Sequence, residues 1–101
     1  MRRGTTPTHN FKLPTSVPVD TLTLIYITYQ QLNRNLVEKT GDDIALDTEN
    51  NKLVITLTQK DTLALKVGKV DIQIRAKIGD AALASNIHGI PVDKILKDGE
   101  I

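Results

Sequence analysis

The chain has 101 residues, the length of one domain with a small hydrophobic core. Its formal net charge of +1 excludes a strong overall field that would attract nucleic acid or a membrane surface. It contains no cysteine, which excludes disulfides and thiolate metal sites. Thirty residues are β-branched (12 Thr, 11 Ile and 7 Val), so the composition favours strands over helices.

The first ten residues are polar and contain Pro7, which opposes a helix. We therefore expect a flexible N-terminal arm over residues 1–10, followed by a single β-sandwich domain over residues 11–101. Arg2 and Arg3 on this arm are candidate interface residues that could reach a phosphate or an acidic partner.

Residues 22–29 are apolar on both alternating sets. This pattern predicts either a central strand buried on both faces or a strand with one face against a partner. The candidate interface residues fall into two sets, with Leu22, Leu24 and Tyr26 on one side of the strand and Ile25, Ile27 and Tyr29 on the other. A turn signal at residues 33–35 then predicts a return strand over residues 36–40.

Residues 44–57 predict a second hairpin. Asn50–Asn51 can adopt the left-handed conformations of a two-residue type I′ turn. That turn pairs Leu46 with Ile55 and places the apolar residues of both arms on one face.

Thr58 precedes Asp61 by three positions, the spacing of a capping box at the start of a helix. We expect one or two helical turns over residues 59–65. A crossover of this size suits the connection between the two sheets of a sandwich.

Residues 69–90 predict the clearest hairpin, because apolar and polar residues alternate along its first arm. Gly79–Asp80 suits a two-residue type II′ turn. A shift by one residue would move the apolar set to the opposite face, so the pattern specifies its own register. The predicted pairs are Ile78 with Ala81, Ala76 with Leu83, Ile74 with Ser85 and Ile72 with Ile87.

These elements predict an all-β fold. We expect an antiparallel, immunoglobulin-like β-sandwich of about seven strands with one short helical turn.

Residues that could support catalysis are few. The hairpin register places Asp71 beside His88 on the outer face, where an Asp–His pair could orient a base, but no nucleophile lies in the same motif. The acidic residues between Asp42 and Glu49 do not have the spacing of a calcium loop. We therefore predict a non-enzymatic protein without a cofactor, a metal or a small-molecule substrate.

Several stretches of the sequence together carry a resemblance to known proteins. They are residues 2–9 with 11–14, 27–30, 57–59, 70–75, 82–85 and 96–99. In combination they resemble small proteins encoded in phages and prophages of Gram-positive bacteria. More distantly, the chain is similar to the N-terminal β-sandwich domain of phage baseplate upper proteins. The resemblance implies a structural role in the virion or tail, and a location in the bacterial cytoplasm during assembly, with the virion as a further candidate.

The function expected on these grounds is a phage structural module that assembles with itself, as a homo-oligomer, or with a tail or baseplate protein. The alternative is a prophage-encoded regulator that binds a host protein through a sheet edge. An enzyme with a site built from dispersed carboxylates ranks last. No nucleic-acid or membrane partner is expected.

Overall fold

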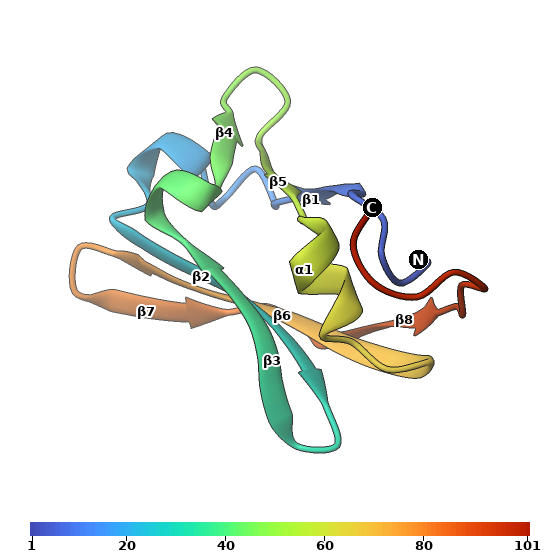
Figure 1. Cartoon of the computed structure of the whole chain (residues 1–101). Helices are drawn as coiled ribbons and strands as arrows, with labels where there is room; N and C mark the ends of the chain where they lie inside the picture. The colour runs from blue at the N-terminus through green and yellow to red at the C-terminus, as the bar shows by residue number, and fades with distance from the viewer.

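The computed structural model describes residues 1–101 and contains two antiparallel sheets linked by one short helix (Figure 1). The strands are β1 (Thr8–Lys12), β2 (Leu24–Gln31), β3 (Arg34–Thr40), β4 (Ala45–Asp47), β5 (Lys52–Thr56), β6 (Gly68–Ile78), β7 (Ala81–Ala84) and β8 (His88–Val92). The helix α1 spans Gln59–Leu63, and 3-10 turns lie at Val19–Thr21 and Gly41–Asp43.

The predicted fold class is confirmed by the strand order. One sheet has the order β1-β5-β4, and the other has the order β3-β2-β6-β7, with β8 also paired to β6. When the strands are lettered along the chain as in an immunoglobulin sandwich, β1, β5 and β4 take positions B, E and D of one sheet. The strands β3, β2, β6 and β7 take positions C′, C, F and G of the facing sheet. Because β7 and β8 together make one broken strand G, the eight strands fill seven positions. No strand occupies position A.

The core lies between the inner faces of the two sheets. Alternation along each strand puts every second side chain there. Thirteen buried hydrophobic residues form it: Val19, Ile27, Tyr29, Val37, Ile44, Leu53, Ile55, Leu57, Leu65, Val70, Ile72, Ile74 and Val92.

The β6–β7 hairpin has the predicted turn. Ala76 pairs with Leu83 and Ile78 with Ala81 across Gly79–Asp80. Gly79 has a φ of 57° and Asp80 has no positive φ, as a type II′ turn requires.

Beyond β7 the predicted register is wrong by one residue. The Ile74 N–H donates to the Ser85 hydroxyl at 3.0 Å instead of to a backbone carbonyl, and an extra residue is accommodated before β8 begins. Ile72 therefore pairs with His88 and not with Ile87. As in a β-bulge, the extra residue redirects the side chains that follow it, and Ile87 becomes exposed.

The two other hairpins differ from expectation in their turns. The β4–β5 pairing places Leu46 opposite Leu53, so its loop has four residues and the predicted type I′ turn at Asn50–Asn51 is wrong. Only Asn51 of that pair has a positive φ. The two-residue turn with two positive φ values lies instead at Leu32–Asn33, between β2 and β3.

The predicted capping box is present at the start of α1. Thr58 Oγ1 accepts from the Asp61 N–H at 3.1 Å, and the Asp61 carboxylate accepts from the Thr58 N–H at 2.9 Å. The helix connects β5 in one sheet with β6 in the other, as expected. No helix in the structure combines the length and apolar character needed to cross a membrane.

The N-terminal residues pair with the rest of the fold and do not form the separate arm expected over residues 1–10. β1 begins at Thr8 and pairs along its length with β5. Upstream, Arg2 forms a parallel bridge with Asp93, and the Pro7 carbonyl accepts from the Leu57 N–H. Long-range backbone bonds of this kind hold polar segments that local sequence patterns do not predict to be ordered.

The bulge allows a matched test of the core. Ile74 is buried and Ile87 is 63% exposed, although the sequence pattern placed both on the core face. Ile74→Ala should lower the free energy of unfolding by about 2–5 kcal/mol, whereas Ile87→Ala should change it by less than about 0.5 kcal/mol. Urea denaturation of both variants measures the difference, and equal losses would contradict the register described above.

Candidate functional site

Strand β2 buries one of its two apolar sets and exposes the other. Ile27 and Tyr29 are fully buried, whereas Leu24 and Tyr26 are 42% and 37% exposed. The alternative prediction that both faces of β2 are buried inside one sandwich is therefore wrong. The outward set makes the outer face of the five-stranded sheet the candidate site.

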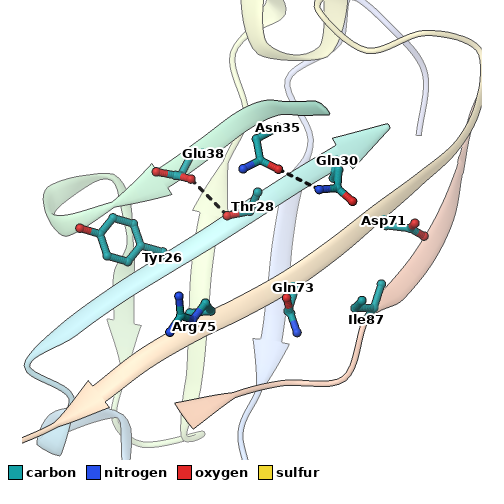
Figure 2. A pocket seen from close by; sticks show the side chains of 9 residues that line it. All are labelled: Tyr26, Thr28, Gln30, Asn35, Glu38, Asp71, Gln73, Arg75 and Ile87. Carbon is teal, nitrogen blue, oxygen red and sulfur yellow. Dashed lines mark hydrogen bonds between the residues drawn. The ribbon is translucent and has the colours of Figure 1, made fainter. Parts of the chain in front are cut away.

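The outer face carries a shallow hollow of about 480 Å³ (Figure 2). Strand register aligns its side chains in rows, with Tyr26 opposite Arg75 and Thr28 opposite Gln73. The lining residues are Tyr26, Thr28, Gln30, Asn35, Glu38, Asp71, Gln73, Arg75 and Ile87.

Hydrogen bonds within the hollow hold part of this surface in place. Gln30 Nε2 donates to Asn35 Oδ1 at 3.0 Å, and Thr28 Oγ1 donates to a Glu38 carboxylate oxygen at 3.3 Å (Figure 2). Gln73 Nε2 donates to the Ser85 carbonyl at 3.0 Å. These bonds orient side chains that could pair with a ligand, and each amide retains further hydrogen-bonding capacity.

The charges on this face are only partly neutralised. Asp71 pairs with Lys69 at 3.5 Å, but Arg75 and Glu38 form no ion pair. Arg75 is exposed on β6 and Glu38 on β3. The hollow can therefore accept a partner with one carboxylate and one positively charged or donor group.

Ile87 at the edge of the hollow was not predicted, because the regular alternation placed it in the core. The sequence feature that could have indicated its outward position is the polar pair Ser85–Asn86, which interrupts the apolar pattern just before Ile87. The bulge at Ser85 turns Ile87 toward the outer face, where it adds an apolar edge.

The remaining candidate interface residues lie elsewhere. Ile25 and Leu22 are half-buried and pack against the core. Arg2 is exposed and donates to the Lys94 carbonyl at 3.0 Å. The structure therefore brings only Leu24 and Tyr26 of the predicted set to the outer face.

Arg3 is a structural residue. Its Nε donates to the Leu65 carbonyl at 2.7 Å and its Nη2 to the Leu63 carbonyl at 3.0 Å. These carbonyls lie at and just beyond the end of α1, where helices leave acceptors without partners. Arg3 also forms an ion pair with Asp98 at 3.2 Å. The guanidinium thus ties the N-terminus to the helix and to the C-terminal segment.

His9 and Tyr29 link the two sheets through a polar contact. His9 Nδ1 lies 2.5 Å from the Tyr29 hydroxyl, and the two rings stack. Burial lowers the pKa of His9, with a smaller contribution from the positive N-terminus. Burial also raises the pKa of Tyr29, with a contribution from the nearby Asp61 carboxylate. A neutral His9 can therefore accept a hydrogen bond from the Tyr29 hydroxyl through Nδ1.

Asp61 and Lys39 form the shortest ion pair, with 2.7 Å between Lys39 Nζ and a carboxylate oxygen of Asp61. Burial alone would raise the pKa of Asp61, but hydrogen bonds from Lys39 and Thr58 outweigh it and hold that pKa below its usual range. The pair joins α1 to the inner face of β3 and supports the fold.

The predicted Asp71–His88 pair is not formed. Asp71 lines the hollow on the outer face, whereas His88 lines a separate groove on the other side of the sheet. The shifted register pairs Asp71 with Gly89. No group of three or more His, Asp or Glu side chains is arranged to hold a metal ion.

Comparison with models of protein families, with curated proteins and with solved structures finds no match for this chain. The resemblance to phage proteins therefore stays a prediction.

Arg3→Ala should destabilise the protein, because it leaves carbonyls after α1 without their charged donor. We expect a loss of about 1.5–3 kcal/mol in the free energy of unfolding. Arg2→Ala is the matched control and should cost less than about 1 kcal/mol, since Arg2 makes one exposed bond. Chemical denaturation of both variants tests this, and similar losses would show that the guanidinium of Arg3 has no special role.

The stability should also depend on pH through His9. Its pKa is lower in the folded chain than its ordinary value of 6.5, so the unfolded chain binds more protons below that pH. The free energy of unfolding should therefore fall as the pH drops from about 7.5 to about 5.5. His9→Gln, which cannot titrate, should remove this decline in urea denaturation experiments. An unchanged decline in the variant would assign it to another group.

Proposed function

We propose that this protein is a non-enzymatic module that works by contact, binding another protein through the outer face of its five-stranded sheet. The observation that carries this proposal is the exposed row of Tyr26 and Arg75 on a sheet face that retains free charges. Tyr and Arg are enriched at the energetic centres of protein interfaces, where they combine apolar area with directed hydrogen bonds.

The composition of the face supports a protein partner. Leu24, Tyr26 and Ile87 supply apolar area around amides that can both donate and accept. A surface that mixes apolar and polar groups in this way is typical of interfaces between proteins that also exist separately. Arg75 requires a carboxylate from the partner if the contact excludes water, because a buried unpaired charge is costly.

The resemblance to phage proteins supports an assembly role for this contact. On that basis the partner is a second copy of the chain or a tail or baseplate protein, met in the bacterial cytoplasm during assembly. The second candidate function, a regulator that binds a host protein through a sheet edge, is favoured by the exposed edge of β7.

The phage role can be tested in the genome that encodes the protein. The chain should carry the double substitution Tyr26→Ala with Arg75→Glu, and the particles should be examined by electron microscopy. We expect folded protein but few complete tails, because the altered face loses both its ring and its positive charge. Leu32→Ala, at an 84% exposed turn away from the hollow, should give normal particles.

Two outcomes would contradict the proposal. Normal tails after deletion of the gene would exclude a structural role and leave the regulator as the surviving candidate. Normal tails with the double variant alone would show that assembly uses another surface. Tail genes beside this gene are also expected, and a neighbourhood of lysogeny genes would favour regulation.

A further inference from the structure

A mainly apolar groove separates the edge of β1 from the edge of β7. Its volume is about 620 Å³, and eight of its 14 lining residues are hydrophobic. Phe11 and Leu22 line it together with Ala76 and Leu83. In an immunoglobulin sandwich, strand A lies beside strand B. Here β1 occupies position B and has no such neighbour, so the groove lies where a strand is missing.

The backbone of β7 offers hydrogen-bonding groups to this open side. Leu83 pairs with Ala76 on β6, and the Ser85 N–H donates to the Ile74 carbonyl at 2.8 Å. Because successive residues of a strand direct their N–H and C=O groups to opposite sides, those of Ala82 and Ala84 point to the free edge.

This edge lacks the features that usually block strand pairing. All four residues of β7 are exposed, and they are three alanines and Leu83. Sheet edges are commonly protected by lysine, proline, a bulge within the strand or a covering loop. The small side chains of Ala82 and Ala84 instead allow another backbone to approach closely.

The groove also favours a ligand that carries a negative charge. Lys12 and His88 line it, and no aspartate or glutamate does. A ligand that carries a carboxylate near Lys12 would meet a positive charge without a competing acidic group.

We propose that an extended segment of a partner protein adds to β7 as a further strand and fills this groove. Its backbone pairs with Ala82 and Ala84, and its alternate side chains are apolar and contact Leu83 and Phe11. It carries an acidic residue that reaches Lys12. This mode is β-strand addition, in which backbone bonds supply affinity and side-chain pockets supply specificity.

A separate partner fits the groove better than a second copy does. In an antiparallel pairing of two β7 strands the second copy would bring only Ala81–Ala84, which carries no carboxylate for Lys12. The groove shares no lining residue with the hollow on the outer face, so this proposal and the assembly role proposed above fail independently.

A defined peptide tests the proposal. The probe is an octapeptide that alternates valine with threonine and carries one central glutamate, and the comparison peptide carries lysine in place of the glutamate. Amide hydrogen exchange should show new protection at Ala82 and Ala84, whose N–H groups are free in the chain alone. The glutamate peptide should bind at least about tenfold more tightly than the lysine peptide, and Lys12→Glu should reverse this preference.

Matched variants distinguish backbone pairing from nonspecific binding of the peptide to the groove. Ala84→Pro removes an outward N–H that the sheet itself does not use, so the fold should tolerate it while peptide binding is lost. Ala84→Val keeps the N–H and should bind, and circular dichroism melting confirms that both fold. Absence of protection at Ala82 and Ala84 with saturating peptide would overturn the proposal. Protection without peptide that grows with protein concentration would overturn the choice of partner in favour of a second copy.

Discussion

Three strands face five across the core of this sandwich. The narrower sheet covers only part of the inner face of the wider one, so the central residues are buried while the β6–β7 end remains open. Ile27 and Tyr29 lie under the three-stranded sheet and are fully buried, whereas Leu83, farther along, is 36% exposed. Burial of apolar area is the main favourable contribution to folding, so this unequal coverage decides which residues stabilise the domain and which stay available for contact.

The small core is supplemented by side chains that bind backbone groups far away in sequence. Gln31 is buried and exchanges hydrogen bonds with the backbone of Lys66, which fixes the segment after α1. Asn51 accepts from the Val19 N–H and donates to the Leu13 carbonyl, which fixes the long connection between β1 and β2. No buried side-chain polar atom lacks a partner. Such bonds stabilise modestly when formed, but their loss leaves buried groups unsatisfied at a larger cost.

Strand β6 relates the two surfaces to one another. Its outward residues, such as Gln73 and Arg75, line the polar hollow, and its inward residues Ile74 and Ala76 line the apolar groove. The bulge at Ser85 places Ile87 on the first surface and His88 on the second. The two contacts proposed above therefore lie on opposite sides of one strand and do not exclude one another.

The sequence by itself determined the features that depend on neighbouring residues: the all-β class, the Gly79–Asp80 turn and the capping box at Thr58. Periodicity and turn chemistry act over a few positions, so a single chain reveals them. Only the tertiary structure decided which face of β2 is exposed, because both of its sets are apolar and the answer depends on the width of the opposing sheet. It also decided that the N-terminal residues are part of the fold, since the carbonyls that accept from the Arg3 guanidinium lie some sixty residues away. The register beyond β7 could not be predicted from the sequence, because the Ser85 hydroxyl replaces a backbone carbonyl as the acceptor of the Ile74 N–H. The alternation of apolar residues carries no information about that replacement.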